Sequence, residues 1–139
     1  MKLLCAFLTF LNLFLNIGNM DAQHDLAVIK DHSGSYFLFD SEQLISIKDT
    51  MSGPYLRFLD VSTMSMGIYS LEAGQSDNQH PHDWDEVYVV IEGRAQCEVG
   101  DSLFAVKKGD LFFVKAHVDH RFLQIEEDLK LLVFFSKKE

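Results

Sequence analysis

Hydrophobic and polar residues alternate in short runs over most of the chain, from Tyr36 to Phe135. The runs are rich in β-branched and aromatic residues, which is typical of strands. Almost no segment has the period of an amphipathic helix, and a polar stretch at residues 40–43 is the one candidate for helical structure. The predicted strands are residues 36–39, 44–47, 55–61, 66–71, 86–92, 94–99, 103–106, 111–114, 121–125 and 129–135.

The segments that separate these runs predict hairpins rather than crossover helices. Glycine or acidic residues stand where tight turns need them, at Glu92-Gly93, Gly100-Asp101, residues 107–110 and residues 126–128. About ten short strands at close spacing indicate an all-β fold, an antiparallel sandwich or a small barrel. A chain of 139 residues forms one such domain.

The first 22 residues differ in composition from the rest. Lys2 precedes an apolar stretch of about fifteen residues, which has the proportions of a secretory signal rather than of a membrane span. Removal of residues 1–22 predicts a secreted or periplasmic protein in which residues 23–139 form the single domain and no membrane span remains. Translation from Met20, giving a cytoplasmic protein, is the alternative, and a short uncleaved anchor is a third reading.

Charge and cysteine content narrow the choice of partners. The formal net charge is −9, and no cluster of basic residues is visible, so a nucleic-acid partner is not expected. The two cysteines are Cys5 and Cys97, and loss of the first segment leaves one thiol and no intramolecular disulfide. Cys97 lies in a strand-like run and is predicted to be a buried structural thiol.

Residues 74–93 gather the side chains that favour metal binding. His80 and His82 stand two residues apart, so in an extended chain both imidazoles point to one side, and Glu86 keeps the same parity. Two imidazoles and a carboxylate suit a divalent transition metal. His120 opens a strand in residues 109–124, and in a closed antiparallel barrel it can complete the set.

The spacing of these residues resembles the cupin family. Gly74, His80-Pro81-His82, Glu86 and Gly93 match every defined position of the first cupin motif, and Gly109 and His120 match the second. Lys115, His117 and Gln124 stand where the family usually has Pro, Gly and Asn. The family Gly indicates a left-handed or tight turn before His120, which histidine adopts less readily.

This resemblance covers roughly residues 55–135 and implies a small single-domain cupin, a jelly-roll β-barrel with one metal in its mouth. It implies Fe(II), Mn(II), Ni(II) or Zn(II), held by His80, His82, Glu86 and His120. If one outer histidine turns away, two histidines and one carboxylate remain, which is still a facial triad suited to non-haem iron.

Three further residues are candidates for catalysis. Tyr88 shares the inward parity of Glu86, His117 lies three residues before His120, and Gln124 shares the parity of His120. A metal-dependent enzyme acting on a small organic molecule, of dioxygenase, oxidase or isomerase type, is the first hypothesis. A non-catalytic sensor or scavenger of metal and small molecules is the alternative. A homodimer is also expected, because the apolar residues 129–135 would need covering at a sheet edge.

Overall fold

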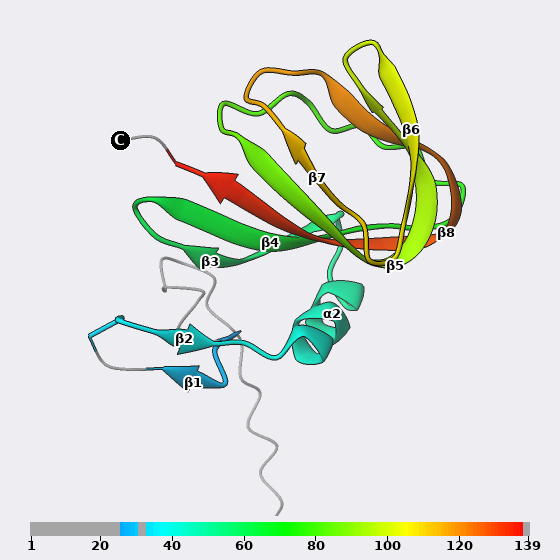
Figure 1. The fold of residues 1–139 in the computed structure, drawn as a ribbon. Coiled ribbons are helices and arrows are strands. Elements are labelled where there is room, and N and C mark those ends of the chain that lie inside the picture. Colours follow the sequence, from blue (N-terminus) through cyan, green and yellow to red (C-terminus); the bar gives the residue numbers. More distant parts are fainter. Residues whose placement is uncertain (1–25, 31–32, 138–139) are drawn as a thin grey trace, which may run out of the picture.

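A computed structural model describes residues 26–30 and 33–137 (Figure 1). The predicted signal segment and the alternative start at Met20 lie outside these residues. Within them, no helix is long and apolar enough to span a membrane. The elements are β1 Ile29–Lys30, β2 Phe37–Leu38, α2 Ser41–Asp49, β3 Tyr55–Asp60, β4 Met64–Leu71, β5 Glu86–Val99, β6 Ser102–Lys107, β7 Leu111–Val114 and β8 His120–Ser136.

One antiparallel sheet forms the body of the molecule and confirms the all-β prediction. Its strand order is β3-β4-β8-β5-β6, and β7 pairs with the first part of β5. The sheet curls over itself in the manner of a jelly roll (Figure 1), but no pairing joins β3 to β6 among the described strands, so the barrel is not closed.

Two of the predicted hairpins are wrong, because the chain does not turn at these positions. In each case the two predicted strands are parts of one long strand. β5 runs through Gly93, and β8 runs through residues 126–128. Gly93 has φ 81°, and a Cβ atom there would collide with the carbonyl oxygen of Asp128. Glycine at this position therefore permits a bulge and a close approach of β5 to β8, where the pairing register also shifts.

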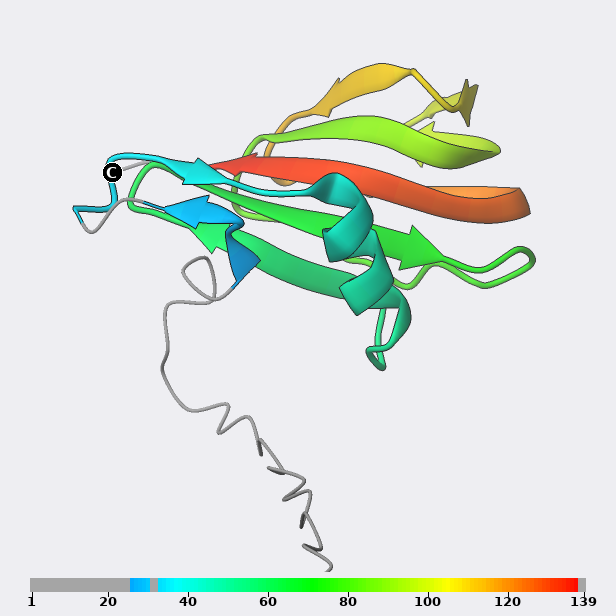
Figure 2. The ribbon, with the colours of Figure 1, turned by 90° about the horizontal axis from the view of Figure 1, so that it is seen from below.

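The predicted strand 44–47 is also wrong, because these residues belong to α2. Asp40 caps this helix: its Oδ1 accepts hydrogen bonds from the backbone N–H groups of Glu42 at 2.9 Å and Gln43 at 3.2 Å. Leu44 packs with Leu56 and Ile68 on the outer face of the sheet. Figure 2 shows α2 lying across β3 and β4. Packing against this apolar face selects the helix over the strand.

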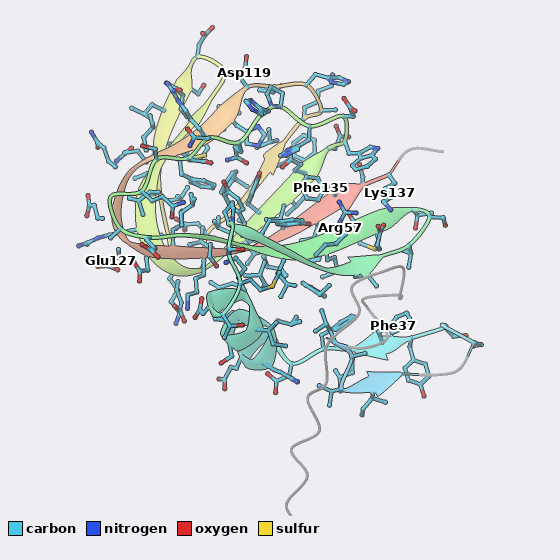
Figure 3. The ribbon with its side chains drawn as sticks, turned by 180° about the vertical axis from the view of Figure 1, so that it is seen from behind. Phe37, Arg57, Asp119, Glu127, Phe135 and Lys137 are labelled. Carbon is cyan, nitrogen blue, oxygen red and sulfur yellow. The ribbon has the colours of Figure 1, made fainter. Side chains whose placement is uncertain are left out.

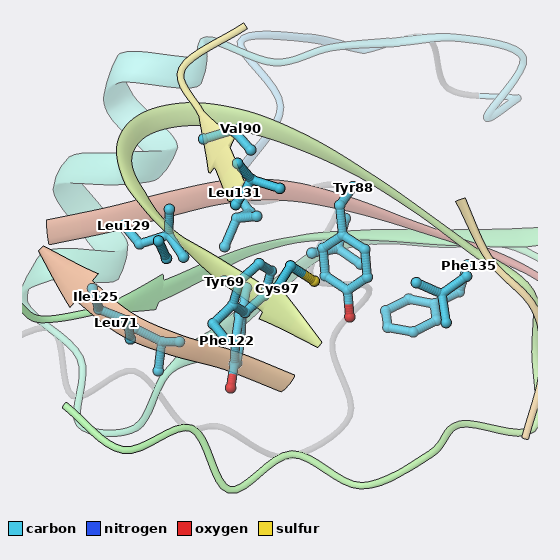
Figure 4. Close-up of a cluster of buried hydrophobic side chains, with 14 residues drawn as sticks. Tyr69, Leu71, Tyr88, Val90, Cys97, Phe122, Ile125, Leu129, Leu131 and Phe135 are labelled. Atoms are coloured by element: carbon cyan, nitrogen blue, oxygen red, sulfur yellow. The ribbon is translucent and has the colours of Figure 1, made fainter. Parts of the chain in front are cut away.

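The main core lies between the two curled halves of the sheet (Figure 4). Cys97 is fully buried there, as predicted. β8 lies between β4 and β5 and is paired on both sides over its apolar residues. The edge-strand argument for a homodimer therefore does not apply, and the homodimer stays a prediction.

Candidate metal centre

The loop between β4 and β5 carries His80 and His82, and one aspartate fastens it to the sheet. Asp77 Oδ1 accepts a hydrogen bond from the hydroxyl of Tyr69 at 2.6 Å, and its Oδ2 accepts one from the backbone N–H of Phe122 at 2.8 Å. It also accepts bonds from the backbone and side-chain N–H groups of Gln79, at 3.1 and 2.6 Å. Asp77 thus links β4, β8 and the loop.

Sequence reasoning missed Asp77. It is one of 21 acidic residues and occupies an undefined position between Gly74 and His80 in the motif. Nothing in the hydrophobic pattern distinguishes it, because its role depends on contacts with residues 8 and 45 positions away.

The first residues of β5 place two polar side chains inside the fold. Glu86 and Tyr88 alternate with outward-facing Val87, and each is only 1% exposed. β7 and β8 pair with this part of β5 from either side, which fixes its backbone. Figure 4 shows the Tyr88 ring directed into the interior beside Phe135.

His120 opens β8 and faces Glu86. Its Nδ1–H donates to the backbone carbonyl of Val118 at 2.8 Å, so that in the neutral ring Nε2 carries the free lone pair. The turn before it is left-handed at His117, with φ 65°. A left-handed or tight turn is expected here, because the second motif usually has Gly at this position. The backbone N–H of His117 donates to the carbonyl of His82 at 2.8 Å, which ties the two ligand-bearing loops together.

His82, Glu86 and His120 converge on one point, their potential ligand atoms lying within 4.8 Å of one another. His82 Nδ1 is 2.6 Å from Glu86 Oε1, and His120 Nε2 is 3.6 Å from Glu86 Oε2. The Tyr88 hydroxyl lies 2.6 Å from the same Oε2 and 3.0 Å from His120 Nε2. Two imidazoles, a carboxylate and an adjacent phenol form a donor set that suits a divalent transition metal.

The electrostatics of the cluster keep a negative charge inside the protein. Burial opposes ionisation of Glu86, but the neighbouring imidazoles of His120 and His82 and the hydroxyl of Tyr88 outweigh burial and lower the pKa of Glu86 to about 2. Burial also opposes the charged form of His120, which for a histidine lowers the pKa. Glu86 and the Val118 carbonyl outweigh this effect and together raise the pKa of His120 above its ordinary value. Burial and the Glu86 charge raise the pKa of Tyr88, which therefore stays a phenol in the absence of a metal.

The structure does not bring every predicted site residue together. His80 is exposed and is not among the three converging residues. It lies in a segment without regular secondary structure, residues 75–82, where the alternation expected of an extended chain does not fix the direction of a side chain. His80 as a fourth ligand stays a prediction. His117 has a side chain 72% exposed, 3.6 Å from Asp83, and Gln124 is exposed with φ 46°. Of the three catalytic candidates, Tyr88 alone faces the cluster.

Comparisons with known proteins agree with this fold. Residues 67–135 match a family model described as "Cupin domain". A protein of Streptomyces coelicolor whose own function is uncharacterized is 44% identical over 101 residues, covering 73% of this chain and 96% of that protein. The chain therefore belongs to the cupin family.

Several solved structures share the fold at low sequence identity. A cupin-2 domain protein from Shewanella frigidimarina is 19% identical with a TM-score of 0.58, over 71% of this chain and 94% of that chain. An RmlC-like cupin from the same organism is 23% identical with a TM-score of 0.57, over 64% and 82% of the two chains. A chain from the crystal structures of the DMSP lyases RdDddP and RnDddQII is 17% identical with a TM-score of 0.55, over 59% of this chain and 46% of that chain. These likenesses show the fold, and the cupins that share it include enzymes.

Proposed function

We propose that this protein is a metal-dependent enzyme that acts on a small organic molecule, in a reaction of dioxygenase, oxidase or isomerase type. The observation that carries the proposal is the convergence of His82, Glu86 and His120 within 4.8 Å. Fe(II), Mn(II), Ni(II) or Zn(II) suits these donors, and a bound metal supplies Lewis acidity and, in the case of iron, affinity for dioxygen.

The roles of the chain's own residues follow from their contacts. Glu86 supplies the negative charge that a cation compensates, and two histidines supply neutral nitrogen donors. The Val118 carbonyl orients His120, as partners behind metal ligands commonly do. Tyr88, with its hydroxyl 2.6 Å from Glu86, holds that carboxylate and offers a polar contact to a substrate oxygen.

A non-catalytic binding protein, a sensor or scavenger, is the second candidate. It is favoured by the exposure of His117 and Gln124. Of the three candidates that the sequence suggested for acid–base catalysis, this leaves Tyr88 alone beside the cluster. The two functions share the same metal ligands, so only turnover separates them.

Turnover is tested on the metal-loaded protein with a panel of small organic acids, phenols, keto acids and sugars. Oxygen consumption reports oxidation, and NMR of the mixture reports isomerisation. Glu86→Gln is the inactive variant, and Glu98→Gln is its matched control, because both carboxylates lie on β5 but Glu98 pairs with Arg121 at the surface at 2.6 Å. Turnover that Glu86→Gln abolishes and Glu98→Gln retains identifies an enzyme; saturable binding without turnover across the panel identifies a binding protein.

The fourth ligand is tested separately through His80→Ala. If the metal content of this variant equals that of the wild type, three residues suffice to hold the metal. If it falls as far as in His82→Ala, the loop closes on the metal and the four-ligand arrangement expected from the motif holds.

We further propose that residues 1–22 direct export and that the mature chain forms a homodimer. N-terminal sequencing of the protein recovered after expression separates cleavage after Ala22 from a start at Met20. Light scattering at micromolar concentration gives the oligomeric state, and a monomer mass would contradict the homodimer.

A further inference from the structure

A cavity of about 400 Å³ opens beside the metal cluster, between β3, β4, the end of β8 and the loop before β5. His82 and Tyr88 form the wall nearest the cluster, and Tyr55 and Arg57 of β3 also line it. Its volume falls within the range of pockets that hold small molecules.

The alternation of β3 turns two polar side chains toward this cavity. Leu56 and Phe58 are buried in the cluster beneath α2, so Tyr55 and Arg57 point to the opposite face. Gly67 on the paired strand lies directly under the Tyr55 ring, and a Cβ atom there would collide with it. Burial raises the pKa of the Tyr55 hydroxyl, and the Arg57 guanidinium beside it opposes that rise. The buried hydroxyl nevertheless makes no hydrogen bond of ordinary geometry among the described residues. Such a group is normally satisfied by a ligand or by water.

Arg57 and Lys137 share one carboxylate at the rim of the cavity, which leaves the Arg57 guanidinium incompletely paired. Asp60 pairs with Arg57 at 3.0 Å and also with Lys137, so one carboxylate serves two cations. A guanidinium has five N–H donors, and this contact with Asp60 occupies one of its nitrogens. Figure 3 shows Arg57 and Lys137 near Phe135, at the same end of the sheet. Asp83, the acidic residue in the lining, has a side chain 87% exposed that faces His117.

Aromatic rings connect the two polar ends of the cavity. The Tyr55 and Phe135 ring centroids are 6.3 Å apart, and those of Phe135 and His82 are 5.1 Å apart, both pairs meeting edge to face. These rings form an apolar wall that leads from Tyr55, beside Arg57, to His82 of the metal cluster.

We propose that this cavity binds a small organic molecule with a carboxylate group, which pairs with Arg57 and accepts a hydrogen bond from Tyr55. Its other end then lies against His82 and Tyr88. This assignment names the substrate class of the proposed metal-dependent enzyme. It rests on that proposed function only for the role of the end of the molecule that lies against His82 and Tyr88. Guanidinium groups bind carboxylates through paired charge-assisted hydrogen bonds, which explains an arginine at this position.

The test uses the fluorescence of Trp84, which lines the cavity and is the one tryptophan of the chain. Benzoate and 3-phenylpropanoate are titrated beside benzamide and 3-phenylpropanamide at fixed ionic strength, so that each pair differs in charge but little in shape. The variants are Arg57→Gln and Tyr55→Phe. Arg121→Gln is the matched control, since Arg121 is equally exposed, at 54% against 51%, and pairs with Glu98 at 2.6 Å.

We expect wild-type protein to bind each acid about tenfold more tightly than its amide, as a charge-assisted pair implies. Arg57→Gln should abolish this preference, Tyr55→Phe should reduce it, and Arg121→Gln should leave it unchanged. Equal affinity for acid and amide in the wild type would overturn the assignment. So would a preference that persists in Arg57→Gln, because the carboxylate would then bind elsewhere, at the metal included.

The titrations are run on metal-loaded and on chelator-treated protein, so that this assignment and the proposed function fail separately. If the protein takes up no metal on reconstitution but still shows the Arg57-dependent preference, the carboxylate site is supported and the metal-dependent function is contradicted. Full metal loading without any acid preference would contradict the carboxylate site alone.

Discussion

Replacing Asp77 tests how the loop that carries the metal ligands is held. Asp77→Ala removes the acceptor of two buried donors, the hydroxyl of Tyr69 and the backbone N–H of Phe122. Each buried donor left without a partner costs about 1–3 kcal/mol, or about 2–6 kcal/mol for the pair. Asp77 is half-buried, so water replaces part of the lost bonding. We therefore expect the free energy of unfolding to fall by about 2–4 kcal/mol.

The assay is urea unfolding followed by far-UV circular dichroism and by Trp84 fluorescence, with the denaturant slope compared between variants. Asp101→Ala, at an exposed turn position between β5 and β6, is the control and should change stability by less than about 0.5 kcal/mol. Asp77→Asn keeps one carbonyl oxygen and should fall between the two. An Asp77→Ala protein as stable as the control would refute the role assigned to this carboxylate.

Three further predictions concern the interior. Burial and the charge of Asp77 raise the pKa of the Cys97 thiol to about 12, so in a Cys5→Ser background a thiol reagent at pH 8 should modify the unfolded but not the folded chain. The folded-state pKa of Glu86 is about 2 against 4.5, so its contribution to the stability of metal-free protein is complete above about pH 4.5 and is lost as the pH falls toward 2; Glu86→Gln should flatten this pH dependence in thermal melts. Gly67→Ala should displace the Tyr55 ring, lower stability by about 1–3 kcal/mol and weaken benzoate binding in the Trp84 assay.

The strands of the sheet could be predicted because the alternation of apolar and polar residues within a single segment indicates both a strand and the face that it buries. β7 was placed at its observed bounds, and the inward parity of Glu86 and Tyr88 agrees with their burial. The prediction failed at Gly93, where a glycine suited to a turn instead allows β8 to approach β5 closely. Turn and bulge use the same conformational freedom, so neighbouring residues alone do not distinguish them.

The same limit explains the helix and the site. Leu44 is apolar in either a strand or a helix, and the face formed by β3 and β4 determines which one forms. Spacing identified His82, Glu86 and His120, which the structure brings together, because these positions belong to a motif. It gave no sign of Asp77, Tyr55 or Arg57, whose contacts depend on strands that are distant in the sequence.

The most direct test of the metal site is the metal content of the purified protein after reconstitution with Fe(II), Mn(II), Ni(II) or Zn(II), measured by elemental analysis. We expect about one ion per chain for the wild type and for Glu98→Gln, and less than about a tenth of an ion for Glu86→Gln, because removing one ligand leaves two nitrogen donors and no charge to compensate the cation. Wild-type protein that retains less than about a tenth of an ion with every metal, or Glu86→Gln protein that retains as much as the wild type, would contradict a metal centre at His82, Glu86 and His120.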